Sequence, residues 1–218
     1  MPRRFDLLIF DWDGTLMDSA ASIALCLQNA CRDLGFRVPS ERDARYVIGL
    51  GLRDAMTHIL PELPVSEYSK VTERYRHHFI QHDAVTRLFR GAEEMLRELR
   101  AAGHLLAVAT GKSRRGLDRA LAQTGLVDCF HVTRCADEGH TKPDPGMLHR
   151  ILEALNVSRE RALMIGDTTH DMAMARAAGM KRLAVRHGAH EEHALLEYEP
   201  LACVADCQSL RNWLADHA

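Results

Sequence analysis

Two aspartates one residue apart, Asp11 and Asp13, end a largely apolar run that begins at Phe5. An apolar run that ends in Asp and Gly is typical of a buried strand leading into a loop. Residues i and i+2 of an extended backbone face the same way, so we expect both carboxylates to project into one volume at the strand's carboxyl end. Two such charges about 4 Å apart repel each other by about 4 kcal/mol at an effective dielectric constant near 20. The pair therefore predicts a nearby positive charge, although a solvated acidic turn is the alternative interpretation.

Thr110 and Gly111 lie at the end of the second apolar segment, and Lys142 lies in a later loop. Thr110 closes the apolar segment that starts at His104, where strand propensity alone would explain a threonine. Lys142 lies in Thr-Lys-Pro-Asp-Pro, where two prolines stiffen the backbone, whereas a loop lysine is ordinarily a solvated charge. The Gly-Lys-Ser that follows Thr110 is not a P-loop, because Leu106 stands where that motif requires a glycine.

Asp167 and Asp171 lie in Gly-Asp-Thr-Thr-His-Asp, directly after the apolar segment from Ala162 to Ile165. One interpretation is the start of a helix, with Asp167 as the N-cap and Asp171 in the first turn, where a negative charge is favourable. That interpretation requires no ligand.

The segment Asp-Trp-Asp-Gly-Thr from Asp11 resembles the first signature of the haloacid dehalogenase (HAD) superfamily, Asp-x-Asp-x-Thr after an apolar strand. The chain as a whole looks most like its phosphoglycolate phosphatase-like subfamily, which has a helical cap in the first insertion position. Segments similar to the other three signatures follow in family order, at Thr110-Gly111, Lys142-Pro143 and Asp167 to Asp171.

The resemblance implies phosphoryl transfer. Asp11 would be the nucleophile, and Asp13 the general acid and base. Thr110 and Gly111 would hold the phosphoryl oxygens, and Lys142 would neutralise the nucleophile and the incoming phosphate.

The resemblance also implies a Mg²⁺ cofactor. Asp11, the backbone carbonyl of Asp13 and Asp167 would bind the ion, with Asp171 bound to it directly or placed just behind. Hard oxygen ligands of this kind suit Mg²⁺.

Relatives with other chemistry differ at single positions. Asp13 argues against dehalogenases and phosphonate hydrolases, which lack the second Asp of the first signature. A β-phosphoglucomutase-type enzyme typically has His five residues after the position of Asp18, where this chain has Ile23. A phospho-acceptor signalling domain has its phosphorylated Asp on a later strand and no inserted cap. We expect a phosphatase acting through an aspartyl-phosphate on a small metabolite, phosphoglycolate-like or a sugar phosphate, with the mutase and the signalling domain as alternatives.

The elements that would position these residues form an α/β fold. Strand and helix alternate from Leu88 onward, which predicts a Rossmann-like, three-layer parallel-sheet core. Residues 1–16 and 89–218 would form this core domain, and 17–88 an all-helical cap domain. The expected strands besides the first are His104–Thr110, Phe130–Thr133, Ala162–Ile165, Arg182–Val185 and Cys203–Ala205. The expected helices are Ala20–Leu34 (capped by Ser19), Ser40–Val47, Asp54–Leu60, Ser66–Asp83, Gly91–Ala102, Arg114–Thr124, Gly146–Leu155, one that ends at Ala178, and Ser209–Ala215.

Within the cap, Arg53 follows Gly49-Leu50-Gly51. The glycines lack the third Gly and preceding strand of a dinucleotide site, so we interpret them as a substrate-facing loop. Arg53 is a candidate for binding a substrate anion, and could equally cap a helix.

The composition narrows the class of partner. The 218 residues are 46% hydrophobic and 27% charged, with a formal net charge of −2, which gives no electrostatic case for nucleic acid or an anionic membrane. No apolar run approaches the ~20 residues of a membrane span. The six cysteines include no Cys-x-x-Cys pair, so we expect free core thiols in a cytoplasmic protein, a monomer or weak homodimer. Two histidine sets have metal-like spacing, but we expect both to be surface groups: His77, His78 and His82, and His187, His190 and His193.

Overall fold

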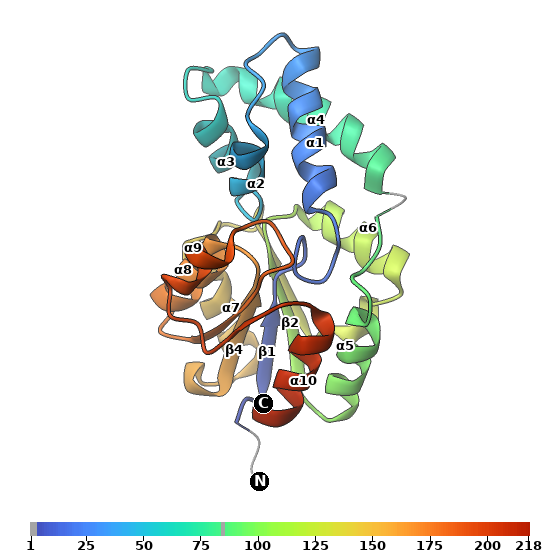
Figure 1. Cartoon of the computed structure of the whole chain (residues 1–218), viewed down its shortest axis with the longest axis vertical. Helices are drawn as coiled ribbons and strands as arrows, with labels where there is room; N and C mark the ends of the chain where they lie inside the picture. The colour runs from blue at the N-terminus through green and yellow to red at the C-terminus, as the bar shows by residue number, and fades with distance from the viewer. Residues whose placement is uncertain (1–3, 84–85) are drawn as a thin grey trace.

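The computed structural model describes residues 4–83 and 86–218, and its centre is a parallel sheet. Within these residues the sheet has six strands in the order β3-β2-β1-β4-β5-β6 (Figure 1). The predicted α/β class, with a Rossmann-like parallel sheet, is confirmed. The strands are β1 (Leu7–Phe10), β2 (Leu105–Thr110), β3 (Val132–Cys135), β4 (Ala162–Gly166), β5 (Lys181–Val185) and β6 (Cys203–Val204).

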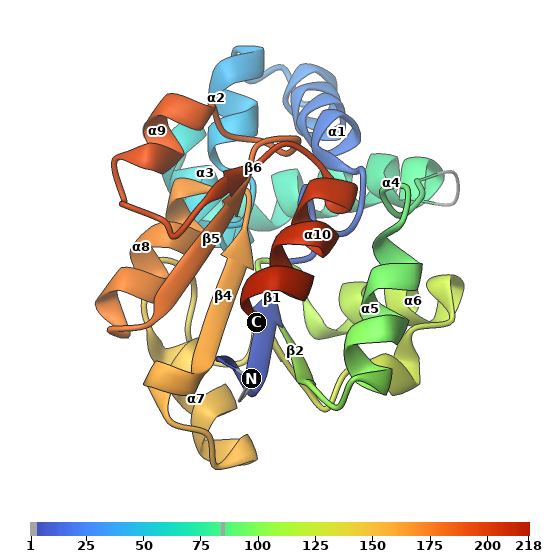
Figure 2. The ribbon, with the colours of Figure 1, turned by 60° about the horizontal axis from the view of Figure 1, so that its bottom comes forward.

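Helices cover both faces of the sheet, as Figure 2 shows for α5 and α6 on one side and α7 and α8 on the other. Side chains of β1 alternate between the faces: Leu8 and Phe10 pack with α5, α6 and α10, whereas Leu7 and Ile9 pack with α7 and α8. Both faces of β1 are therefore buried, as an apolar run without polar alternation requires. The helices of this part are α5 (Ala92–Ala101), α6 (Arg114–Thr124), α7 (Gly146–Leu155), α8 (Thr169–Ala177), α9 (Glu192–Leu196) and α10 (Cys207–His217), with short 3₁₀ turns η2 (Val127–Cys129) and η3 (Arg159–Arg161).

A helical insert, residues 20–83, lies between β1 and α5 in the chain and above the carboxyl ends of the strands (Figure 1). It has a hydrophobic cluster of its own, to which Leu27, Met56 and Val71 contribute from three different helices. Its elements are α1 (Ala20–Asp33), α2 (Glu41–Tyr46), α3 (Leu52–Ile59), the 3₁₀ turn η1 (Val65–Glu67) and α4 (Tyr68–Asp83).

The two chain segments that join the insert to the sheet run side by side. Met17 forms an antiparallel bridge with Leu88, and the Phe89 amide donates to the Leu16 carbonyl at 2.9 Å. The Asp18 amide donates to the Arg87 carbonyl of the opposite segment at 3.0 Å. The insert is therefore attached through one narrow, hydrogen-bonded neck.

Most predicted elements are present, with instructive differences. The helices predicted over Arg114–Thr124 and Gly146–Leu155 have those bounds. The third strand begins at Val132, two residues later than predicted, and the short helix α9 was not predicted. Ser19 precedes α1 as predicted but makes no side-chain cap, because its hydroxyl donates to Asp13 at 2.7 Å.

The cysteines are free, and all except the half-buried Cys203 are buried, which confirms the expectation of core thiols. Within residues 4–83 and 86–218, none of the helices combines the length and the apolar character that crossing a bilayer would demand.

Candidate active site

The chain changes direction across the sheet at β1. β2 and β3 lie on one side of β1, and β4, β5 and β6 lie on the other. In open α/β sheets, ligands bind outside the carboxyl ends of the strands at such a switch point. Asp11 follows β1, Thr110 ends β2 and Asp167 follows β4, so three predicted site residues come from adjacent strand ends.

Lys142 reaches this edge from the loop before α7. Its ammonium lies 2.6 Å from Asp11 Oδ1 and 2.6 Å from Asp171 Oδ1, and all three side chains are buried. Burial alone would lower the pKa of Lys142, but the Asp11 and Asp171 carboxylates outweigh it and hold the pKa above its ordinary value. Lys142 is therefore a fixed positive charge in contact with Asp11, as the sequence required.

Asp167 is held by two donors. The Thr15 hydroxyl donates to its Oδ1 at 2.7 Å, and the Ala189 amide donates to its Oδ2 at 2.8 Å. A Cβ added at Gly14 or Gly188 would lie 2.2 or 2.1 Å from Asp167 Oδ2, so both positions need glycine for this close approach. Burial, and next the charge of Asp171, raise the pKa of Asp167 to about 7.

The carboxylates of Asp11, Asp167 and Asp171 form a group that fits a divalent cation. One oxygen from each lies within 4.8 Å of the others, and no other group of this kind occurs within the described residues. Asp11 Oδ2 is buried without a hydrogen-bond partner, although such atoms are normally paired. Burial raises the pKa of Asp11 well above its ordinary value; Lys142 opposes that rise and the other two carboxylates add to it. Three buried carboxylates beside one ammonium leave excess negative charge, which Mg²⁺ would offset.

The side chain of Asp13 turns to a different lysine. Lys112 Nζ lies 2.8 and 2.9 Å from the two Asp13 oxygens, and Ser19 supplies a further hydrogen bond. Lys112 also lies 4.7 Å from the centroid of the Phe79 ring on α4. Sequence reasoning missed Lys112, because it considered the Gly-Lys-Ser segment only as a P-loop. The available signal was the repulsion between Asp11 and Asp13, which the structure resolves with one lysine for each carboxylate.

Asp171 also has a role in starting α8. Thr168 is the N-cap of a capping box: its hydroxyl oxygen accepts from the Asp171 amide at 3.2 Å, and its amide donates to Asp171 Oδ2 at 3.0 Å. The helix-start interpretation is therefore right for Asp171 but wrong for Asp167, which is not the N-cap. Because Asp171 Oδ1 contacts Lys142, one carboxylate serves both the helix and the buried charge cluster.

A cavity of about 570 Å³ lies between the insert and the core. Asp11, Asp13, Thr110 and Gly111 line it from the core, and Gly49 to Arg53 line it from the insert. A Cβ added at Gly111 would lie 2.5 Å from the Gly49 carbonyl oxygen, so the loop after β2 and the glycine loop of the insert touch through their backbones. Arg53, the candidate for binding a substrate anion, thus lines the cavity.

Among the described residues, neither histidine set contributes to a group that could hold a metal ion, but the expectation of surface groups is wrong for His190. It is buried; its Nδ1 accepts from the Thr169 amide at 3.0 Å and its Nε2 donates to the Tyr46 carbonyl at 3.0 Å. His170 Nε2 donates to the same carbonyl at 2.7 Å. The two imidazoles therefore tie α2 of the insert to the core. Of the others, His77 and His193 are exposed, His78 pairs with Asp33, His187 contacts the Thr15 carbonyl, and the side chain of His82 lies outside the described residues.

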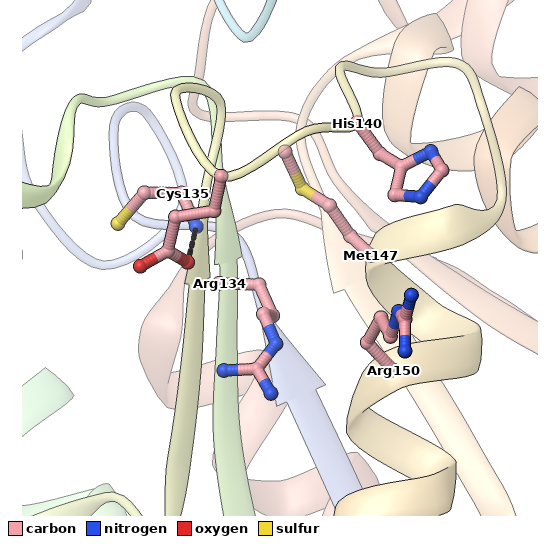
Figure 3. Close-up of a pocket in the computed structure, with 6 residues that line it drawn as sticks. Arg134, Cys135, His140, Met147 and Arg150 are labelled. Atoms are coloured by element: carbon pink, nitrogen blue, oxygen red, sulfur yellow. Dashed lines mark hydrogen bonds between the residues drawn. The ribbon is translucent and has the colours of Figure 1, made fainter.

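A second cavity, of about 380 Å³, lies between β3 and α7 (Figure 3). Arg134, His140 and Arg150 line it, as does Glu138, which accepts a hydrogen bond from the Cys135 amide. None of the predicted site residues contributes to it. The predicted chemistry therefore belongs to the cavity at the sheet's switch point.

The fold thus places a buried carboxylate cluster at the carboxyl ends of a parallel sheet. The chain belongs to the haloacid dehalogenase-like hydrolases, whose family model matches residues 8–185. This confirms the predicted family.

Three similar proteins illustrate this relationship. A "probable phosphatase IndB" of Dickeya dadantii (strain 3937) is 36% identical over 91% of this chain and 88% of its own. A phosphoglycolate phosphatase of Vibrio cholerae serotype O1 is 30% identical over 91% of this chain and 92% of its own. The crystal structure of a hydrolase from Pseudomonas syringae superimposes with a TM-score of 0.90 at 20% identity, over 98% of this chain and 99% of its own, and shows the same fold.

Proposed function

We propose that this protein is a Mg²⁺-dependent phosphatase that hydrolyses a small phosphate monoester through an aspartyl-phosphate at Asp11. The observation that supports it most directly is the buried contact of Asp11 with Lys142, beside the carboxylates of Asp167 and Asp171. The similar proteins named as phosphatases support the same reaction.

The first step forms the aspartyl-phosphate. A carboxylate oxygen of Asp11 attacks phosphorus, the bond from phosphorus to the ester oxygen breaks, and Asp13, protonated when the ester binds, donates that proton to the departing alcohol. Lys142 offsets negative charge at the nucleophile and the phosphoryl oxygens. Thr110 Oγ1 accepts from the Lys112 amide at 3.2 Å, which leaves its hydroxyl proton available for a phosphoryl oxygen.

The second step releases phosphate. Water gives a proton to Asp13 and attacks phosphorus, and the bond to Asp11 breaks to restore the carboxylate. Lys112 and Ser19 orient Asp13 for both proton transfers. Asp11, Asp167 and Asp171, with the Asp13 carbonyl, would hold Mg²⁺, which when bound stabilises negative charge on the phosphoryl group.

We further propose that residues 17–88 act as a cap over a core of residues 1–16 and 89–218, with a small-molecule phosphate ester as partner in the cytoplasm. The cavity between insert and core supports this division, since closure over it would exclude water from the transfer. Ile23 lines this cavity, so the position where a mutase would have a histidine offers no proton-transferring group.

Hydrolysis of p-nitrophenyl phosphate with and without Mg²⁺ tests the proposal. We expect steady multiple turnover that stops on chelation and returns with added Mg²⁺. Asp11→Asn should remain folded by circular dichroism and lose turnover at least about a thousandfold, whereas Asp128→Asn, at an exposed site, should match the wild type. Near-normal turnover by Asp11→Asn would refute the assigned nucleophile, and a single phosphorylation without turnover would refute the phosphatase.

A further inference from the structure

The cavity between the insert and the core is large for a phosphate group alone. Its volume of about 570 Å³ falls in the roughly 300–1,000 Å³ range of pockets that enclose drug-sized ligands. Asp11 and Asp13 occupy its core side, and α1, α3, α4 and α6 supply residues beyond them (Figure 1). Most of this space is therefore available to the alcohol part of the ester.

One wall of the cavity is apolar and aromatic. Ile23 and Leu27 of α1 and Tyr75, Phe79 and Ile80 of α4 line it. The rings of Tyr75 and Phe79 stack at 5.6 Å between centroids, and 55% of Ile80 is exposed although it is aliphatic. Such a wall strengthens binding only when apolar surface of the ligand covers it.

The cavity also has guanidinium groups without a carboxylate partner. Arg53, Arg76 and Arg115 line it, and within the described residues none of their side chains makes a hydrogen bond or ion pair. Their neighbours behave differently: Arg74 lies 2.6 Å from Asp33, and Arg114 lies 2.9 Å from Glu138. Arg74 and Arg114 thus have carboxylate partners, whereas Arg76 and Arg115, which lie on the same two helices and line the cavity, have none among the described residues.

The charge of this region points to a second anion. Beyond the catalytic pair, Asp137 is the acidic residue among those that line the cavity, and its Oδ1 accepts from the Arg114 amide at 2.9 Å. The transferring phosphoryl group already has Lys142 beside Asp11. Unpaired guanidinium groups bind carboxylates and phosphates well because their fork of donors matches two oxygens.

We propose, on the basis of the function proposed above, that the substrate is a phosphate monoester whose alcohol carries both a ring and a second anionic group. The phosphoryl group binds at Asp11, the ring lies on the wall formed by α1 and α4, and the second anion binds the arginines. A glycolate ester has the second anion but no surface to cover the apolar wall.

Four esters of primary alcohols separate the two features. Ethyl phosphate has neither, phosphoglycolate has the anion, benzyl phosphate has the ring, and 4-carboxybenzyl phosphate has both. With the wild-type protein and Mg²⁺, we expect kcat/KM for 4-carboxybenzyl phosphate to exceed that of each other ester by about tenfold or more. A phosphoglycolate or ethyl phosphate value equal to or above it would overturn the proposal.

Variants then assign each feature to its residues. Arg76→Gln and Arg115→Gln should lower kcat/KM for 4-carboxybenzyl phosphate at least about fivefold more than for benzyl phosphate. Phe79→Leu should reduce the advantage of benzyl over ethyl phosphate. Arg74→Gln is the matched control, because Arg74 lies on the same helix as Arg76 and Phe79 but is paired with Asp33. It should change neither the ratio of 4-carboxybenzyl to benzyl phosphate nor the ratio of benzyl to ethyl phosphate. Equal losses for all esters in the Arg76 and Arg115 variants would overturn the anion site.

The failure of this proposal differs from that of the phosphatase itself. If p-nitrophenyl phosphate is turned over and Asp11→Asn abolishes that turnover, but the four esters show no preference, only the substrate class is wrong. If neither p-nitrophenyl phosphate nor any ester is hydrolysed, the proposed function fails and the substrate class with it.

Discussion

Replacing Lys112 by methionine removes a charge but keeps a long side chain, and we expect it to destabilise the fold strongly. Lys112 Nζ lies 2.8 Å from Asp13 Oδ1, and both side chains are only 9% exposed. At an effective dielectric constant of 20, two unit charges at that distance attract each other by about 6 kcal/mol. Desolvation offsets part of this, but removal of one partner from a buried pair costs about 3–5 kcal/mol, because the other charge remains buried.

Lys70→Met is the matched control for this substitution. Lys70 lies 2.7 Å from Glu67, nearly the same separation, but the two side chains are 62% and 34% exposed. Exposed pairs of this kind contribute about 0–1 kcal/mol. The two variants therefore differ chiefly in the burial of the ion pair.

Thermal and urea unfolding measure the difference. For a chain of this size, 1 kcal/mol changes Tm by about 2–4 °C, so we expect Lys112→Met to lower Tm by about 6 °C or more and Lys70→Met by less than about 4 °C. In the Asp13→Asn background, Lys112→Met should cost much less, since the buried carboxylate is gone. Equal Tm changes in the two lysine variants, or no coupling with Asp13, would refute the reasoning.

Two further predictions concern contacts between the insert and the core. Gly111→Ala places a Cβ 2.5 Å from the Gly49 carbonyl oxygen, so it should displace the insert and lower both turnover and Tm. Gly116→Ala is the control: its added Cβ would have its nearest contact at 3.3 Å, so it should lower turnover and Tm less. A larger loss in Gly116→Ala than in Gly111→Ala would contradict the close approach. Burial, and next the charge of His170, lower the pKa of His190 from 6.5 to about 4. The unfolded chain therefore binds the proton first as the pH falls below about 6.5, and folding stability decreases until about pH 4. The loss between these pH values, on the order of 3 kcal/mol from 1.36 kcal/mol per pKa unit, should be smaller in His190→Gln when unfolding is measured across this range; an unchanged profile would show that His190 is not its source.

The elements with strong local signals could be predicted from the sequence. α6 begins after Ser113, whose hydroxyl accepts from the Gly116 amide, and ends before Gly125, which has the left-handed conformation. Residues next to the helix therefore specify both of its ends. β3 has weaker signals: its bounds depend on register with β2, where Thr110 pairs with Cys135, and pairing is a property of the folded sheet. The five-residue helix α9 is too short for its periodicity to be recognised.

The same distinction, between local sequence signals and contacts made only in the folded sheet, holds for the residues of the candidate site. The repulsion between Asp11 and Asp13 predicted a nearby cation, the family resemblance pointed to Lys142, and the structure places Lys142 in contact with Asp11. Lys112 could not be assigned to Asp13, since their 99-residue separation is bridged only by the parallel pairing of β1 and β2. The burial of His190 could not be predicted from its local sequence, because it depends on contact with Tyr46, which lies far away in the chain and belongs to the insert.

The narrow neck below α1 sets a rule for building chimaeras of this protein. Ser19 stands at the first turn of the insert, yet its hydroxyl donates to Asp13 in the core. The return segment joins at Leu88 through its bridge to Met17. An exchange of the helical block for that of another hydrolase should therefore splice after Ser19 and before Leu88. A junction placed one turn earlier would remove a hydrogen bond from Asp13, the proposed proton donor, along with the helices.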